Sequence, residues 1–191
     1  GYINVHPQTG RFEIDQDNFF KIGEASPKYN LGIRNDFAWK GLSLGFMIDA
    51  RVGGVVVSST QAMMDQYGVS KATAEARDRG GVNINSGQVD SKLYYEIVGG
   101  GRNGYALSEY TYSATNVRLR ELSLSYNLPK NWFRDKLDVS VSLIGRNLWM
   151  IYKKAPFDPE LTSNTGTYFQ GYDYFMPPSQ RNIGFGVKVS F

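Results

Sequence analysis

The sequence contains no cysteine, and His6 is its only histidine. The absence of cysteine excludes disulfides and thiolate chemistry, and it agrees with export through an oxidising compartment. A single histidine excludes a multi-histidine metal site within the chain. A single histidine also excludes a histidine-based triad with further histidines. We predict no metal, no cofactor and no catalytic residues, and we do not expect the chain to be an enzyme.

Long apolar runs and basic runs are also missing. The longest aliphatic run is Val55-Val56-Val57, whereas a membrane-spanning helix needs about 18 consecutive apolar residues. The net charge is +3, but the basic residues are scattered, with no run longer than Lys153-Lys154. Because nucleic-acid binding usually shows a basic stripe, we expect no nucleic-acid partner.

Tyrosine, phenylalanine and glycine are abundant, and five short segments alternate between apolar and polar residues. Such alternation is typical of strands with one apolar face. In the last segment, Ile183, Phe185, Val187, Val189 and Phe191 point one way. The predicted strands cover residues 29–37, 41–51, 117–127, 137–148 and 181–191.

The third predicted strand changes phase in its middle. Val117 and Leu119 define one alternation, and Leu122 and Leu124 define another that is shifted by one residue. One extra residue near Arg120-Glu121 would absorb this shift, so we predict a β-bulge there.

Short and long connections alternate along the chain, as they do in outer-membrane β-barrels. The connections after the first and third strands are short, whereas those over 52–116 and 149–180 are long. If the last strand ends at the periplasm, the long connections are extracellular. Aromatic residues stand where the two interfacial girdles are expected: Trp39, Trp132, Phe133, Trp149 and Tyr152. The alternative is a soluble antiparallel sandwich, whose strands also alternate.

The first long connection carries a predicted helical insert. Residues 58–66 read as a short helix, and Ser70 reads as the N-cap of a second helix over 71–79 that ends at Gly80-Gly81. The segment 94–98 reads as strand-like and precedes Gly99-Gly100-Gly101-Arg102-Asn103-Gly104. A dinucleotide site needs a helix directly after such glycines, and none is expected here, so we interpret them as a loop tip.

Several short motifs, in order, resemble the C-terminal region of the SusC/RagA family of TonB-dependent outer-membrane transporters. The stretches that carry the resemblance, which covers essentially the whole chain, are Asn4-Val5-His6-Pro7-Gln8-Thr9-Gly10, Ile22-Gly23-Glu24-Ala25-Ser26-Pro27, Arg118 to Pro129, Gly145-Arg146-Asn147-Leu148, Phe157-Asp158-Pro159-Glu160 and Pro177 to Phe191. The chain begins Gly1-Tyr2-Ile3-Asn4 without a recognisable signal peptide, which fits a segment of a longer protein as well as a mature one.

The resemblance implies an all-β fold, an antiparallel up-and-down meander that forms the last five strands of a large transmembrane β-barrel, with a short helical insert in one extracellular loop. Residues 1–191 would be the C-terminal part of that barrel, without its plug domain. The implied function is import of oligosaccharides or peptides across the cell outer membrane, energised by TonB acting on the plug. The implied partners are a SusD-like surface lipoprotein, TonB, the barrel-assembly machinery and outer-membrane lipid. A soluble carbohydrate-binding β-domain and a structural outer-membrane protein stay open as alternatives.

Candidate contact residues lie in the last long connection and at the last residue. Aromatic faces suit sugars and peptides, and they also suit packing against the barrel rim or a partner; the candidates are Tyr168, Phe169, Tyr172, Tyr174 and Phe175. Asp158 and Glu160 could suggest a glycosidase pair, but neighbouring loop positions rarely face each other across a sugar. Phe191 resembles the terminal aromatic signal that the barrel-assembly machinery reads. The side chains expected to face the barrel interior are Arg34, Asp36, Asp49, Arg118, Asp138, Arg146 and Lys188.

Overall fold

The structure is a computed structural model, which describes residues 4–5, 12–13, 20–84, 87–100, 106–133, 136–161, 166 and 169–191. His6 and most of the glycine-rich loop tip therefore lie outside the described residues. The chain divides into two compact units. The insert unit comprises Gly1–Ala25, Val55–Tyr112 and Thr162–Met176, and the sheet unit comprises Ser26–Gly54, Ser113–Leu161 and Pro177–Phe191. None of the helices in the described part of the chain has the length and apolar character to cross a membrane.

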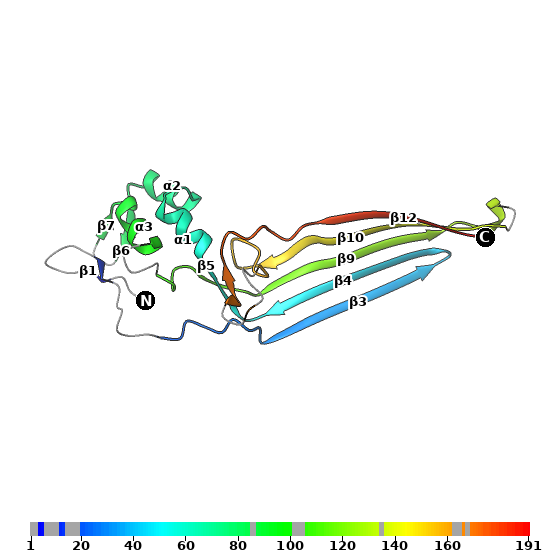
Figure 1. Ribbon diagram of the computed structural model, residues 1–191, viewed down its shortest axis with the longest axis horizontal. Helices are drawn as coiled ribbons and strands as arrows, with labels where there is room; N and C mark the ends of the chain where they lie inside the picture. Colours follow the sequence, from blue (N-terminus) through cyan, green and yellow to red (C-terminus); the bar gives the residue numbers. More distant parts are fainter. Residues whose placement is uncertain are drawn as a thin grey trace. The chain divides into compact units, whose positions relative to one another are not determined.

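The sheet unit is one antiparallel meander. Five strands lie side by side in the order β12-β10-β9-β4-β3, as Figure 1 shows. Their bounds are Tyr29–Trp39 for β3, Leu42–Val52 for β4, Asn116–Asn127 for β9, Asp138–Lys153 for β10 and Asn182–Ser190 for β12. Strands that follow one another in this set are neighbours in the sheet, so the predicted up-and-down meander is confirmed. The strands start and end within a few residues of the predicted positions, except that β10 continues to Lys153.

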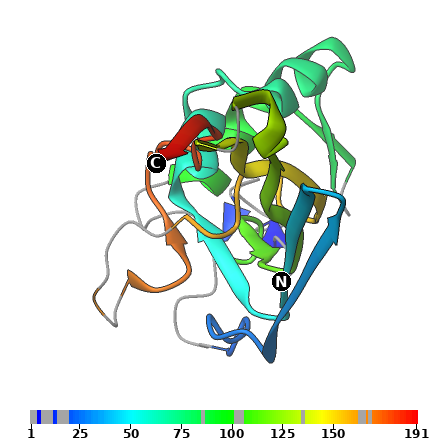
Figure 2. The ribbon, with the colours of Figure 1, turned by 90° about the vertical axis from the view of Figure 1, so that its right-hand side faces the viewer.

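The connections at one end of the sheet are tight. Lys40 and Gly41 join β3 to β4 with φ values of 45° and 86°. Two consecutive residues with positive φ form the hairpin turn whose twist matches that of the strands. A short 3₁₀ helix, η1 (Lys130–Phe133), lies between β9 and β10 at the same end, which faces the viewer in Figure 2.

The β-bulge predicted near Arg120 is confirmed. Met47 of β4 pairs with Glu121, and the next residue, Ile48, pairs with Leu119, so Arg120 is the extra residue. On the other side of β9, the register with β10 shifts at the same place, between Arg146 and Trp149. The bulge lets the apolar residues on both sides of it share one face of the sheet.

The two faces of the sheet differ sharply. On one face, large apolar side chains stand exposed on all five strands: Leu31, Ile33, Phe37, Leu44, Leu124, Leu143, Ile183, Phe185 and Val187. The opposite face carries small and charged residues in register across neighbouring strands, such as Ser43 with Ser125, Asp49 with Arg118, and Ser140 with Lys188. The sheet therefore has an uncovered apolar face and a polar face.

The insert unit contains three short helices and small sheets. The helices are α1 (Ser59–Gln66), α2 (Lys71–Asp78) and α3 (Ser91–Gly100). The short strands are β1 (Asn4–Val5), β2 (Phe12–Glu13), β5 (Val55–Ser58), β6 (Val82–Ile84), β7 (Gly87–Val89), β8 (Thr111–Ser113) and β11 (Tyr172–Asp173). They form the pairs β1-β2 and β6-β7 and a sheet of order β11-β5-β8.

The predicted helix starts are confirmed, and one strand prediction is wrong. Ser58 and Ser70 cap α1 and α2, because their hydroxyls accept hydrogen bonds from the backbone N–H of Gln61 and Thr73. The segment 94–98, predicted as strand-like, belongs to α3. Asp90 accepts the backbone N–H of Leu93 at 3.0 Å and so begins a helix that the alternation of tyrosines and aliphatics did not reveal.

The insert unit has a small core of its own. Ala62, Val98 and Tyr110 are buried together, with Tyr94 packed against them. A Cβ on Gly99 would lie only 2.6 Å from the carbonyl oxygen of Ala62, so a glycine is needed where α3 crosses α1. This unit therefore has a small apolar core that is independent of the sheet strands.

Candidate functional site

Two arginines of β9 project from the polar face of the sheet unit. The side chain of Arg118 is only 3% exposed, and it contacts Asp158 at 2.7 Å and Glu160 at 3.4 Å. Its other terminal nitrogen donates a hydrogen bond to the Ser179 hydroxyl at 3.2 Å. Arg118 thus lies on the polar face, where the chain itself covers its side chain.

Arg120, the bulge residue, forms the second half of the network. It contacts Asp49 at 2.5 Å and Glu160 at 3.0 Å, and it donates a hydrogen bond to the Asn147 side chain at 3.2 Å. As the extra residue of the bulge, Arg120 points to the same face of the sheet as Arg118. Both guanidinium groups therefore reach the same loop. Hydrogen-bonded pairs between guanidinium and carboxylate groups are stronger than neutral hydrogen bonds.

The carboxylates belong to a segment that we call the strap, residues 154–161, directly after β10. Asp158 also accepts hydrogen bonds from Ser179 and from the backbone N–H of Glu160. Burial by itself would raise the pKa of Asp158, but the hydrogen bonds from Arg118 and Ser179 outweigh it and hold the pKa below its ordinary value. Both strap carboxylates are held by arginines, so the glycosidase interpretation, which needs a free pair, finds no support.

The predicted aromatic residues of the last connection lie in the insert unit. Phe169 packs edge-on against Tyr172 with ring centroids 6.4 Å apart, and Tyr174 packs edge-on against Phe175 at 5.3 Å. Tyr168 lies outside the described residues. Phe169, Tyr174 and Phe175 are each about half exposed, so these three rings form a surface that we call the aromatic surface.

Hydrogen bonds hold the aromatic surface to the start of α1. Within the insert unit, β11 pairs with β5, and Asp173 is buried there and accepts the Ser58 hydroxyl at 2.6 Å. The backbone N–H of Phe175 donates to the Thr60 hydroxyl at 2.6 Å. Asp173 is therefore occupied within the protein, whereas Gln170 of the same segment is exposed.

Phe191 and the girdle residues are exposed. Phe191 follows the last strand, β12, and its side chain is fully exposed, while Trp39, Trp132 and Trp149 are each more than 60% exposed. Trp39 and Trp132 lie at the turn end of the sheet, and Trp149 lies in the part of β10 that pairs with Leu119, beyond the bulge. The two groups thus stand at different heights along the strands, as girdles do.

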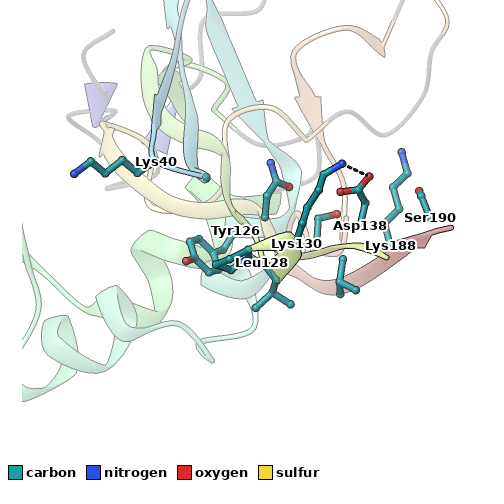
Figure 3. A pocket seen from close by; sticks show the side chains of 12 residues that line it. Lys40, Tyr126, Leu128, Lys130, Asp138, Lys188 and Ser190 are labelled. Carbon is teal, nitrogen blue, oxygen red and sulfur yellow. Dashed lines mark hydrogen bonds and ion pairs between the residues drawn. The ribbon is translucent and has the colours of Figure 1, made fainter. Parts of the chain in front are cut away.

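A groove of about 660 Å³ opens at the turn end of the sheet. Figure 3 shows Lys130 directed at Asp138, with which it pairs at 3.0 Å, and Lys188 extending beside them. Lys40 also lines the groove but extends away from the other labelled side chains. The lysine excess favours anions over cations, although all these charges are well exposed to water.

A smaller cavity of about 370 Å³ lies among the three helices of the insert unit. Its lining mixes Arg77 and Lys92 with Asp65, Glu96 and Tyr95. Arg77 donates to the Gly68 carbonyl at 2.9 Å, and Lys92 lies 3.7 Å from Glu96. Arg77, Lys92 and Glu96 therefore already have partners within the protein, and the described residues contain no cluster suited to a metal ion.

Comparison with known proteins agrees with this architecture. No family model matches the chain. It is 26% identical to TonB-dependent receptor P3 of Formosa agariphila over 95% of this chain and 18% of that protein. It is 27% identical to TonB-dependent receptor P39 of the same organism over 100% of this chain and 19% of that protein. The resemblance to the SusC/RagA family of TonB-dependent outer-membrane transporters is confirmed.

Solved structures show the same fold. The RagAB peptide importer in its closed-closed state matches 100% of this chain and 21% of that one, with a TM-score of 0.62 and 20% sequence identity. A second RagAB peptide transporter structure matches 85% of this chain with a TM-score of 0.55 and 21% identity. The predicted fold class, antiparallel strands of a large barrel with a helical insert, is therefore confirmed.

The similarity to these relatives tests two further predictions, the cellular location and the absence of enzyme activity. The two relatives are named TonB-dependent receptors, and the predicted outer-membrane location and the prediction that the chain is not an enzyme are confirmed. The chain spans about a fifth of the length of the relatives that it matches. The plug domain and the assignment of 1–191 as a whole to the barrel stay predictions.

Sequence reasoning missed the arginine network. It placed Asp49 and Arg118 on the interior face, and it noticed Asp158 and Glu160 as a carboxylate pair, but it did not connect the two sets. The bulge at Arg120 was the one available signal, because it predicts a redirected side chain next to Arg118.

Proposed function

We propose that the chain forms the last five strands of an outer-membrane transporter barrel that imports oligosaccharides or peptides. TonB energises import through a plug outside this segment, and a SusD-like surface lipoprotein is the partner. The observation that carries the proposal is the pair of contrasting faces of one antiparallel meander, together with the similarity to TonB-dependent receptors.

The apolar face fits hydrocarbon. Leu31, Leu124 and Phe185 are 52%, 43% and 71% exposed, and such side chains recur on all five strands. A soluble carbohydrate-binding β-domain would have to keep this whole surface in water, which monomeric soluble proteins rarely do. A bilayer instead takes up alternate side chains of tilted strands, which argues against the soluble alternative.

The sheet edges fit a larger barrel. Within the described residues, β3 pairs only with β4, and β12 pairs only with β10. Long unpaired edges invite uncontrolled pairing with other chains, and closed barrels remove them. We infer that strands of the same polypeptide outside residues 1–191 pair with β3 and β12.

Peptides are the first substrate class to test. The solved neighbours are peptide importers by name, whereas the relatives from Formosa agariphila are named only as receptors. The aromatic surface of Phe169, Tyr174 and Phe175 is a candidate contact for the substrate or for the lipoprotein. Because Asp173 is occupied by Ser58, fewer polar groups are free to fix the orientation of a sugar. This favours a protein or peptide as the contact of these rings.

Growth of the encoding bacterium on defined nutrients tests the proposal. The full-length gene is deleted, and the strain is compared with its parent on peptides or on oligosaccharides as the limiting nutrient. We expect a growth defect on one nutrient class, the same defect when TonB is removed, and recovery when the gene is restored. Normal growth on every nutrient, with the protein present in the parent's outer membrane, would instead indicate a structural outer-membrane protein.

A second experiment tests the partner. The tagged full-length protein is purified from native membranes, and co-purifying lipoproteins are identified for the wild type and for the Phe175→Ala variant. The proposal expects a SusD-like lipoprotein with the wild type. If the lipoprotein remains bound to Phe175→Ala while peptide uptake falls, the aromatic surface contacts substrate and not the partner.

A further inference from the structure

The strap lies on the polar face of the sheet. Its carboxylates contact Arg118 and Arg120 of β9, and Arg120 also contacts Asp49 of β4. All three wall residues belong to the face that carries the small and charged side chains. The chain that leaves β10 therefore does not continue straight outward from the strand end but folds back over the polar wall.

Contacts hold the strap at both of its ends. Where it leaves β10, the Lys153 ammonium donates to the carbonyl oxygens of Pro156 and Phe157 at 3.1 and 3.3 Å. Further along the strap, Ala155 is buried and the side chain of Asp158 is only 8% exposed. Where the connection returns to β12, Ser179 contacts both Arg118 and Asp158, and Asn147 donates to the Gln180 carbonyl at 3.3 Å.

The network that fixes the strap is mostly shielded from water. The side chains of Arg118 and Asp158 are 3% and 8% exposed, and that of Glu160 is 24% exposed. Opening the strap would require the charge-assisted hydrogen bonds of Asp158 and Glu160 with Arg118 and Arg120 to break together, and each of these is stronger than a neutral hydrogen bond. In contrast, the exposed pair of Lys130 and Asp138 at the other end of the sheet can separate at little cost.

We propose that the strap is a fixed constriction that narrows the passage along the inner wall of the barrel and so limits the size of the substrate. Arg118 and Arg120 are its positioning residues. This proposal rests on the proposed function, because it takes the polar face as the barrel interior. It identifies residues 154–161 as a size-selecting element, distinct from the aromatic surface.

A cysteine accessibility experiment in the full-length protein tests the proposal in intact cells. Ser123 lies on the polar face of β9, about 10 Å below Arg120 at the usual rise per strand residue. Residues 1–191 contain no cysteine, so Ser123→Cys is unique in this segment, and any cysteine elsewhere is replaced. The cells are treated from outside with a small maleimide dye or with a long polyethylene-glycol maleimide.

The strap is released by Asp158→Asn combined with Glu160→Gln, which removes charge while keeping side-chain shape. We expect the long reagent to label the released variant at least about tenfold faster than the parent, since a tenfold change requires only about 1.4 kcal/mol, whereas a broken buried ion pair is worth more. The small dye should react equally with both. The matched control, Lys130→Gln with Asp138→Asn, should change neither rate.

Each outcome decides a different point. Equal labelling by the long reagent with and without the strap carboxylates would overturn the constriction. If neither reagent labels Ser123→Cys in any variant, the strap does not control access to this part of the wall, and the constriction fails. The growth experiment on the proposed function does not depend on this outcome. If the double variant does not reach the membrane, Glu160→Gln alone, at the more exposed carboxylate, should raise long-reagent labelling in the same direction by a smaller factor; an unchanged rate would overturn the proposal.

Discussion

The two units handle apolar side chains in opposite ways. The insert unit buries Val56, Ala62 and Val98 among its own helices and strands. The sheet unit turns its leucines, valines and phenylalanines outward and buries a charged network on the opposite face. The insert unit has the apolar core of a protein in water. The sheet unit has the apolar outer face and polar inner face of a barrel wall between lipid and a polar interior.

The largest expected effect concerns the buried charges of the sheet unit. Arg118→Gln leaves Asp158 buried without its cation, so we expect a loss of about 3–5 kcal/mol in the free energy of unfolding. The measurement is urea unfolding of the full-length protein in membranes or detergent. The matched control, Lys130→Gln, removes an exposed pair and should change stability by less than about 1 kcal/mol. Equal losses for both variants would contradict the importance of burial.

A charge on the apolar face gives the next largest effect. Leu124→Arg places a cation where we expect hydrocarbon, which costs about 2–4 kcal/mol near the membrane midplane. Ser123→Arg, one residue away on the polar face, should be far better tolerated. The measurement is the amount of folded, heat-modifiable protein in the outer membrane. If Ser123→Arg lowers this amount more than Leu124→Arg does, the face of Ser123 and not that of Leu124 contacts lipid.

Removal of Phe191 tests assembly of the same wall. Its fully exposed aromatic side chain follows β12 and resembles the signal for the barrel-assembly machinery. We expect deletion of Phe191 from the full-length protein to lower its outer-membrane level, measured by quantitative blotting. Phe20→Ala, which also removes an exposed aromatic ring but lies in the insert unit, is the control. Unchanged levels after the deletion would refute the role.

The insert unit should respond to ordinary helix capping. Ser70→Ala removes the hydroxyl that accepts the backbone N–H of Thr73, so α2 should lose about 1 kcal/mol. We expect faster local hydrogen exchange in α2 with little change in the sheet strands. Lys71→Ala, at an exposed position of α2, is the control. If α2 exchanges no faster in Ser70→Ala than in Lys71→Ala, the cap does not stabilise this helix.

Acid should affect the strap only at low pH. Asp158 lies outside the strands, and its pKa is held below its ordinary value of 3.8. A carboxyl whose pKa is lowered by folding contributes stability above its unfolded pKa, and this contribution is lost as the pH falls through the folded pKa. The long reagent and the small dye attack the same thiolate in Ser123→Cys, whose amount falls with pH, so the ratio of the two labelling rates is the measure of the strap. This ratio should be constant from about pH 7 to 5, whereas a rise in the ratio within this range would contradict the lowered pKa.

Local patterns predicted most of the fold. Alternation at Leu42 to Ala50 and at Ile183 to Phe191 defined strands, because one face of each is apolar. The phase change around Arg120 defined the bulge, and serine hydroxyls at positions 58 and 70 defined two helix starts. The helix over 91–100 was missed because its tyrosines and aliphatics also suit a strand, and its place against Ala62 and Tyr110 decides the outcome.

The sequence by itself determined that this chain forms an antiparallel barrel sheet with one apolar and one polar face. Periodicity, girdle aromatics and short motifs are local properties, so they can be read without the structure. Only the tertiary structure decided that Arg118 and Arg120 hold Asp158 and Glu160. These residues lie 40 positions apart in the pairs Arg118–Asp158 and Arg120–Glu160. Their pairing depends on the register of β9 with β10, on the bulge, and on the return of the strap over the polar face. A contact between distant segments requires the strands to be in place first, so no local pattern could encode it.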